Sequence, residues 1–156
     1  ALRGLIGEPE RVVYTDIWHV EATPPSITTI LRYPNDVRVV YTWTYLGDLR
    51  DYFEEIAVMS ASNRVRIQFP SPYLRNFPTP IGVQGMEDGA AFVKRVEASY
   101  DEAFREELSA FYDCVVNDHP PITDAADGRR DIAILQQVVA AMKPDGLGGE
   151  AARSLL

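Results

Sequence analysis

The two histidines are the first candidates for acid–base chemistry, because an imidazole titrates close to neutral pH. They are His19 and His119, one hundred residues apart. His19 follows Trp18 in a strand-like stretch with carboxylates close by. It is either the acid or base of a pocket or, as we favour, an edge-strand residue that faces water. His119 precedes two prolines, and we expect a solvated turn residue.

Aromatic side chains offer the other visible binding chemistry. Trp18, Trp43 and Tyr45 lie in strand-like segments, and their rings suit stacking against a sugar or a nicotinamide. Aromatic residues on a sheet more often belong to a core or an interface, so both interpretations stay open.

The other reactive residues have structural explanations. The only cysteine is Cys114, which excludes an internal disulfide and a cysteine-based metal site, and we favour a small buried helix residue over a nucleophile. Glu54 and Glu55 are adjacent in a strand, so they point to opposite faces and form no carboxylate dyad. Asp124 and Asp127 stand at a helix start, where capping explains them. None of these residues indicates a particular reaction.

Composition narrows the class of protein. The chain has 156 residues, 46% hydrophobic and 24% charged, as in an ordinary globular domain. A net charge of -8 argues against a nucleic-acid partner, because an acidic surface repels phosphates. No apolar run approaches the roughly 20 residues of a membrane span, so we expect no membrane partner. With its one cysteine, the chain fits a cytoplasmic protein best.

The first two thirds of the chain predict β-strands. Runs rich in β-branched and aromatic residues are separated by turn signals at Asn35-Asp36 and Ser62-Asn63. Four prolines within residues 70–80 predict a surface loop. The expected strands lie in ERVVYTDIWHVEA, SITTILRYP, DVRVVYTWTYLG, YFEEIAVMSAS and RVRIQFP, with one or two more in IGVQGM and AAFVKRVEAS.

Beyond residue 100 the apolar period becomes helical. One predicted helix has an apolar stripe of Phe104, Leu108, Phe111, Tyr112 and Val115, and the next has Ile132, Leu135, Val139 and Met142. Strands followed by helices predict an α+β fold, a largely antiparallel open sheet with the helices packed on one face. We expect one domain over residues 1–144 and a flexible, glycine-rich tail over 145–156.

The predicted strand at residues 36–46 is apolar on both faces. Val39 and Trp43 share one face, and Val40 and Leu46 share the other. Because two helices cover only one face of a sheet, we expect the other face to meet another subunit, another domain or a ligand. The alternative is that threonine and tyrosine hydroxyls make this face wettable.

The two ends of the chain carry a resemblance. ALRGLIGEPERV is similar to the point in the glucose-fructose oxidoreductase / inositol dehydrogenase / MocA (Gfo/Idh/MocA) family where the catalytic helix leads into the first strand of the C-terminal domain. VMSASNRVRI resembles a strand pair of that family, with its glycines replaced. The far end resembles the family's closing helix pair at Phe111, Val115, Pro121, Thr123, Asp127 and Gly128.

The resemblance implies the C-terminal domain of an NAD(P)-dependent oxidoreductase acting on a sugar, polyol or related alcohol. Such a domain shapes the substrate pocket and forms oligomers through its open sheet face. NAD or NADP would bind a dinucleotide-binding domain expected upstream of Ala1, together with the catalytic lysine and histidine, so no catalytic residue is assigned here. The implied substrate-binding candidates are Trp43, Tyr45 and Tyr52, and we add His19.

A second hypothesis comes from another class of protein. The chain is then a stand-alone α+β module that binds a ligand through an aromatic pocket, or a dimerisation domain, in both cases without catalysis. The residues that precede Ala1 discriminate between these hypotheses.

Overall fold

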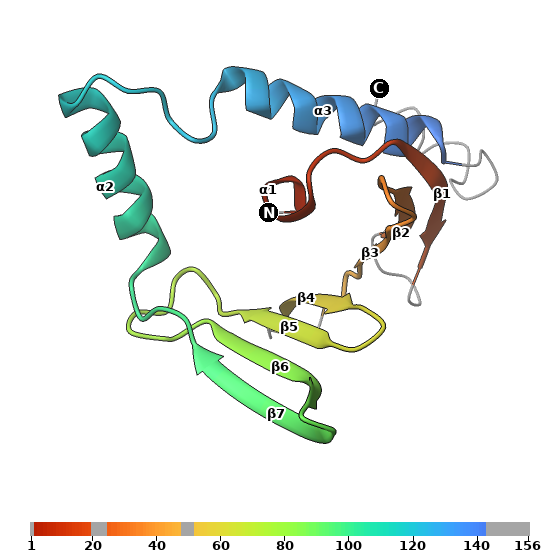
Figure 1. The fold of residues 1–156 in the computed structure, drawn as a ribbon. Helices are drawn as coiled ribbons and strands as arrows, with labels where there is room; N and C mark the ends of the chain where they lie inside the picture. Colours follow the sequence, from red (N-terminus) through yellow and green to blue (C-terminus); the bar gives the residue numbers. More distant parts are fainter. Residues whose placement is uncertain (1, 20–24, 48–51, 143–156) are drawn as a thin grey trace. The chain divides into compact units, whose positions relative to one another are not determined.

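The computed structural model describes residues 2–19, 25–47 and 52–142. Figure 1 shows its helices and strands. In chain order they are α1 (Leu2–Ile6), β1 (Arg11–Trp18), β2 (Ser26–Arg32), β3 (Arg38–Trp43), β4 (Glu54–Met59), β5 (Arg64–Phe69), β6 (Pro80–Glu87), β7 (Ala90–Glu97), α2 (Ala103–Val116) and α3 (Ala125–Ala140).

The strands form two antiparallel sheets, one in the order β1-β2-β3 and one in the order β4-β5-β6-β7. The predicted α+β class is confirmed, and the expected open sheet is divided into a three-stranded and a four-stranded sheet. The chain likewise divides into two compact units, one with α1, β1–β3 and α3 and the other with β4–β7 and α2. The tail predicted at residues 145–156 lies outside the described residues.

The three-stranded sheet is an antiparallel meander, and the predicted turn at Asn35-Asp36 connects β2 to β3. Asn35 and Asp36 have φ angles of 57° and 58°, as both central residues of a type I′ hairpin require. The Val37 N–H donates to the Pro34 carbonyl across this turn at 3.3 Å. The turn sets the register in which Leu31 lies opposite Val39.

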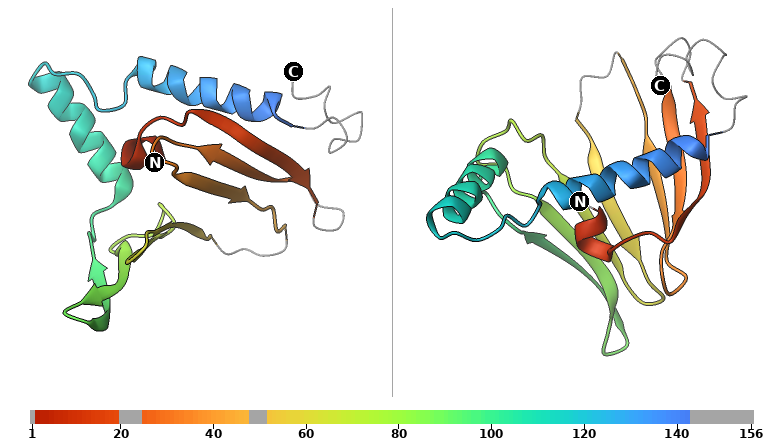
Figure 2. Two further views of the ribbon diagram at one scale, coloured as in Figure 1. Left: turned by 45° about the vertical axis from the view of Figure 1, so that its right-hand side comes forward. Right: turned by 90° about the horizontal axis from the view of Figure 1, so that it is seen from above.

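The core of the first unit lies between this sheet and α3. Leu31, Tyr33 and Val138 are buried together. Directly paired residues share a sheet face, so Val12 and Val39, which flank Leu31 in the register, lie on the same side. The left view in Figure 2 shows α3 lying along β1, a strand that it contacts. The predicted packing of a helix on one face therefore applies to α3.

Two buried threonines link β1 to β2 within this unit. The hydroxyls of Thr15 and Thr29 lie 2.9 Å apart, and both side chains are at most 3% exposed. The Thr29 hydroxyl also donates to the Tyr14 carbonyl at 3.0 Å. Because a hydroxyl has a single proton, the donor between the two threonines is Thr15.

Helix α1 ends at Ile6, directly before a glycine. Gly7 has a φ of 82°, the left-handed conformation that favours glycine after a helix. An arginine then ties α1 to α3. The guanidinium of Arg3 lies 2.6 Å from the carboxylate of Asp127 and 2.7 Å from that of Asp131, so one cation bridges two successive turns of α3.

The four-stranded sheet is a meander in which residues 70–79 connect β5 to β6 and short turns join the other neighbouring strands. Its last two strands are separated by Asp88 and Gly89, which have φ angles of 51° and 77° and form a two-residue hairpin. The segment predicted as one or two strands is therefore two. The turn predicted at Ser62-Asn63 also connects β4 to β5, and the Ser60 N–H donates to the Asn63 carbonyl at 2.8 Å.

The two faces of the four-stranded sheet differ sharply in polarity. By the register, one face combines apolar side chains from all four strands, interrupted by Lys94 and bounded by Glu54 and Glu87 at strand ends. We call it the apolar face: Ile56, Val58, Val65, Ile67, Ile81, Val83, Phe92 and Val96. The opposite face carries ion pairs, among them Arg66 with Glu55 at 3.2 Å. Residues 52–122, all of which the structure describes, contain no buried side chain. No side chain of the apolar face is therefore fully buried: Val58 and Val96 are exposed, and the other six are half-buried.

Helix α2 is amphipathic, and none of its residues is buried. Its predicted stripe is apolar as expected, but Leu108, Phe111 and Val115 are each more than 60% exposed. Among the residues of α2, Phe104 in the first turn meets another aromatic ring, and the ring centroids of Phe104 and Tyr73 lie 5.7 Å apart. The predicted packing of this helix on a sheet is not seen among the described residues of its unit.

Candidate functional site

Trp43 and Tyr45 form an aromatic pair at the end of β3. Their ring centroids are 6.2 Å apart with the planes tilted by 45°, within the range of favourable aromatic pairs. Alternation along a strand puts both side chains on one side. The two rings are 46% and 38% exposed, so a ligand from solvent can reach them.

The backbone after β3 fixes the position of Tyr45. Its N–H donates to the Ser26 hydroxyl at 3.1 Å, and the Ser26 side chain is fully buried. The Tyr45 ring also lies over Gly47, because a Cβ placed there would be 3.1 Å from the tyrosine Cε1. Tyr45 is thus set between Trp43 and a glycine that leaves room for its ring.

Trp18 lies at the same end of the sheet but on the other face. It pairs with Ser26, whereas Trp43 pairs with Ile27, and successive residues of β2 point to opposite faces. The Trp18 indole N–H donates to the Thr28 hydroxyl at 3.0 Å. Trp18 and Trp43 therefore do not stack on one ligand from the same face.

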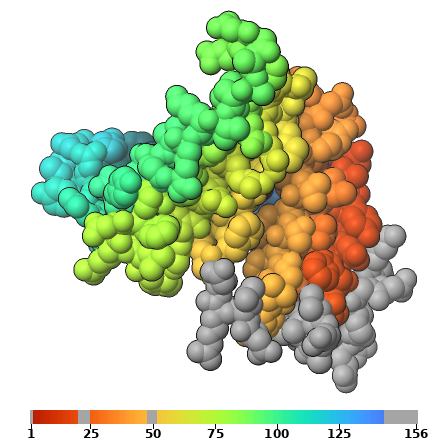
Figure 3. All heavy atoms as spheres, turned by 90° about the horizontal axis from the view of Figure 1, so that it is seen from below, coloured from red at the N-terminus to blue at the C-terminus, as the bar shows by residue number. Residues whose placement is uncertain are grey.

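The threonine row beside Trp18 belongs to a surface that α3 does not cover. Thr28 and Thr42 are direct neighbours across the strands, with hydroxyls 3.4 Å apart. Figure 3, drawn from the side opposite α3, shows the red and orange atoms of β1–β3 without helix atoms over them. Val40, on the same face as Thr42, is 65% exposed. This face combines threonine hydroxyls with an exposed valine, so both alternatives for the two-sided strand stay open.

His19 and Tyr52 are not brought to the aromatic pair by any described contact. His19 follows directly after β1 and is exposed. Tyr52 belongs to the second unit, whereas His19, Trp43 and Tyr45 belong to the first. The Tyr52 hydroxyl donates to the Glu54 carboxylate, and this hydrogen bond raises the pKa of the tyrosine above its ordinary value. The negative form of this phenol is disfavoured, so Tyr52 is suited to donating a hydrogen bond rather than to acting as a base.

The other residues with candidate chemistry mostly lie where the pattern predicts. Glu54 pairs with Phe69 and Glu55 with Gln68, so the two carboxylates occupy opposite faces as expected. The Asp124 carboxylate accepts the Asp127 N–H at 2.7 Å, which confirms the capping role. Cys114 lies on α2 but is only half-buried.

Two features escaped the sequence reasoning. The first is the apolar face of the four-stranded sheet, although the alternation in Ile56-Ala57-Val58 and Val65-Arg66-Ile67 is a period-two signal that predicts it. The second is an ion pair between His119 and Asp113, with 2.7 Å between Nε2 and Oδ2. Their six-residue separation spans a helix end, so helical periodicity alone does not predict the contact.

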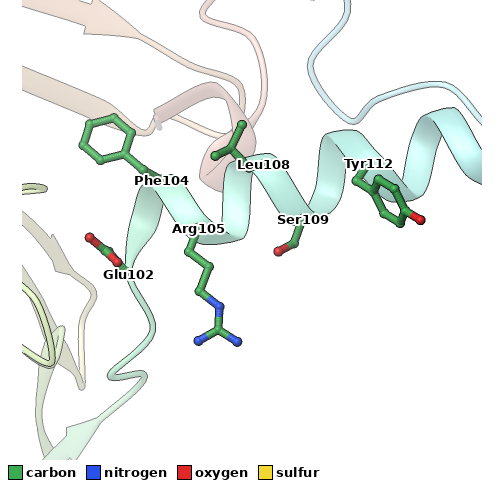
Figure 4. Close-up of a pocket in the computed structure, with 6 residues that line it drawn as sticks. All are labelled: Glu102, Phe104, Arg105, Leu108, Ser109 and Tyr112. Carbon is green, nitrogen blue, oxygen red and sulfur yellow. The ribbon is translucent and has the colours of Figure 1, made fainter.

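Two hollows are lined by residues of the second unit. One of about 530 Å³ runs along α2, lined by Glu102, Phe104, Arg105, Leu108, Ser109 and Tyr112. Figure 4 shows Phe104 and Leu108 projecting from one side of this helix and Arg105 and Ser109 from the opposite side. A second hollow of about 360 Å³ follows the turn between β4 and β5. Neither includes a residue of the predicted substrate site.

Among residues 2–19, 25–47 and 52–142, no cluster of three or more histidine, cysteine, aspartate or glutamate residues is arranged to bind a metal ion. None of the helices that the structure describes has the length and apolar character needed to cross a membrane. The aromatic pair is therefore the best-defined binding feature, and it offers ring faces rather than a catalytic group.

Compared with known proteins, the chain matches no family model, no curated protein and no solved structure.

Proposed function

We propose that this chain is the C-terminal, substrate-binding and oligomerisation domain of an NAD(P)-dependent oxidoreductase of the Gfo/Idh/MocA type. The substrate would be a sugar, a polyol or a related alcohol. The sequence resemblance at both ends of the chain is the observation that carries the proposal. The α1–Gly7–β1 transition agrees with it, since a helix ends at Gly7 and a strand begins at Arg11.

The aromatic pair supports a role in binding rather than in chemistry. Trp43 and Tyr45 offer partly exposed rings, and the apolar C–H faces of a sugar or polyol suit such surfaces. Bound NAD or NADP would supply hydride transfer. The nicotinamide-binding motif of the family matches no position of this chain, so a separate dinucleotide-binding domain would hold the cofactor.

The apolar face of the four-stranded sheet supports a role in assembly. An apolar surface on one side of a sheet whose side chains are only half-buried or exposed is typical of a surface that another protein surface covers. The proposal assigns it to a second copy of the protein and places the protein in the cytoplasm, in line with its one cysteine.

Turnover by the full-length protein tests the proposal. We expect reduction of NAD or NADP, measured by absorbance, with at least one member of a panel of sugars and polyols, and no turnover by residues 1–156 alone. Trp43→Ala and Tyr45→Ala should raise KM about 2- to 10-fold, the value of an aromatic contact. Tyr100→Ala, a change at an aromatic residue that is 58% exposed and outside the pair, is the matched control and should leave KM unchanged.

Two results would contradict the oxidoreductase proposal: no nicotinamide reduction with any member of the panel, or turnover by the isolated chain. The aromatic pair favours a second candidate, a stand-alone ligand-binding module. That candidate predicts a saturable change in tryptophan fluorescence when the isolated chain is titrated with a sugar, and loss of that change in Trp43→Ala.

A further inference from the structure

The turn that follows α2 holds the His119 ring between two oxygen atoms. Its Nε2 lies 2.7 Å from Oδ2 of Asp113, and its Nδ1 lies 3.2 Å from the carbonyl oxygen of Pro120. A carboxylate and a carbonyl can only accept hydrogen bonds. Neutral imidazole has one N–H and can serve only one of these oxygens, whereas the imidazolium serves both.

The end of α2 positions the carboxylate that faces the ring. The Asn117 side-chain amide donates to Oδ1 of Asp113 at 2.6 Å, which leaves Oδ2 for His119. The His119 backbone N–H returns to the Cys114 carbonyl at 3.2 Å, and Asp118 between them has a φ of 50°. This is the left-handed helix ending in which the second residue after the cap bonds back to the last turn. These hydrogen bonds therefore fix the backbone that positions the His119 ring beside Asp113.

The charges around the ring favour its protonated form. Asp113 faces it from α2, Asp118 is its neighbour in the chain, and the C-terminal end of α2 contributes the negative end of the helix dipole. The hydrogen bond between the two side chains raises the pKa of His119 above 6.5 and lowers the pKa of Asp113 below 3.8, and the Pro120 carbonyl adds to the first effect.

We propose that His119 is a proton-operated latch, in which the imidazolium ties the Pro120 carbonyl to the end of α2 and loss of the proton releases it. The latch controls residues 117–122, where the chain leaves the second unit before α3 (Figure 1). Without the proton, Nδ1 presents a lone pair to a carbonyl oxygen at 3.2 Å, and this contact becomes repulsive. The Pro120-Pro121 segment is then free to leave the helix end.

The two pKa shifts set the pH range of the latch. A raised pKa in the folded state means that His119 contributes its full stabilisation below 6.5 and loses it as the pH rises through the raised value. A lowered pKa means that Asp113 contributes fully above 3.8 and loses its contribution as the pH falls through the lowered value. The latch is therefore closed between the lowered pKa of Asp113 and the raised pKa of His119, where carboxylate and imidazolium coexist, and it opens as the pH rises through the pKa of His119.

NMR titration of the 156-residue chain tests this proposal. Imidazole signals labelled with ¹⁵N should give a pKa for His119 above 6.5, and the backbone N–H signals of residues 117–119 and Ile122 should shift with the same midpoint. Asp113→Asn should move that pKa toward 6.5. His119→Gln identifies the signal and should abolish the shared response of the turn amides.

Glu106→Gln is the matched control, because it removes one carboxylate from the first turn of the same helix, far along it from the ring. It should leave the His119 pKa close to the wild-type value. An unshifted wild-type pKa, a pKa insensitive to Asp113→Asn, or turn amides that do not follow the His119 midpoint would each overturn the proposal. Since the Asp113 side chain is 57% exposed, Asp113→Asn should fold, and far-UV circular dichroism checks this.

Discussion

The buried hydroxyl of Thr29 acts as acceptor and donor at once, and its contribution can be isolated. It accepts a hydrogen bond from Thr15 and donates to the Tyr14 carbonyl. Thr29→Val keeps the side-chain shape but leaves the Thr15 hydroxyl, which is 1% exposed, without its acceptor. We expect a loss of about 1–3 kcal/mol in the free energy of unfolding, the cost of a buried unsatisfied polar group.

The double variant supplies the control for this expectation. Once Thr29 is valine, Thr15→Val removes the stranded hydroxyl, so the double variant should lose less stability than the sum of the two single variants. Urea unfolding of all four proteins measures this difference. Strict additivity would show that the two hydroxyls do not interact in the folded protein.

At the scale of single residues, the residue types predicted the sheet face or helix end at which a residue lies, but not which other residues it contacts. Adjacency alone placed Glu54 and Glu55 on opposite faces, and a helix-start signal placed Asp124 as a cap. The i, i+2 spacing of Trp43 and Tyr45 agrees with their shared side. The partner of His119 depends on the path of the chain after α2, and a left-handed Asp118 determines that path. Aspartate adopts this conformation more readily than most residues, but most aspartates do not, so its presence alone did not predict this path.

At the scale of elements, the pairing of β6 with β7 depends on one glycine. Gly85 lies opposite Phe92, and a Cβ at Gly85 would be 2.2 Å from the Asn63 side-chain oxygen and 2.9 Å from the Phe92 ring. Gly85→Ala therefore forces both neighbours to move. Because the clashing atoms are the ends of side chains that are not buried, we expect a loss of no more than about 1 kcal/mol in the free energy of unfolding, measured by urea denaturation.

Gly82 provides the matched control, because it lies in the same strand and a Cβ there would meet no atom within 4 Å. Gly82→Ala should be neutral or stabilising, since alanine reduces the conformational entropy of the unfolded chain. Equal effects of the two substitutions would mean that the phenylalanine ring does not cover Gly85 in solution.

The strand order within each sheet followed from local signals, whereas the environment of α2 did not. Turn residues such as Asn35-Asp36 and Asp88-Gly89 determine which neighbouring strands pair. An amphipathic period identifies the apolar side of a helix but not the surface that covers it. The sequence pattern therefore predicted the stripe on α2 correctly and, by assuming a single sheet beneath it, predicted a packing that its unit does not show.

At the scale of the whole molecule, the proposed oligomer depends on the polarity of the four-stranded sheet. Val96 lies on the apolar face opposite Ile81, whereas Val93, three residues earlier in β7, lies on the charged face opposite Gln84. Both side chains are exposed, at 38% and 79%, so arginine at either position should change the stability of the isolated fold by no more than about 0.5 kcal/mol. The two substitutions add the same charge to the same strand on opposite faces.

Light scattering of the full-length protein distinguishes the two faces. If the apolar face meets a second copy, Val96→Arg places a charge in a desolvated interface, which is costly unless the charge is paired. We expect Val96→Arg to yield a smaller species and Val93→Arg to keep the wild-type mass. A monomeric wild type, or equal masses for both variants and wild type, would contradict an interface on this sheet.

The same light-scattering comparison with Trp43→Asp tests the aromatic pair. A smaller species would assign Trp43 to an interface, whereas an unchanged mass would favour its role in a ligand pocket or its cover by a helix.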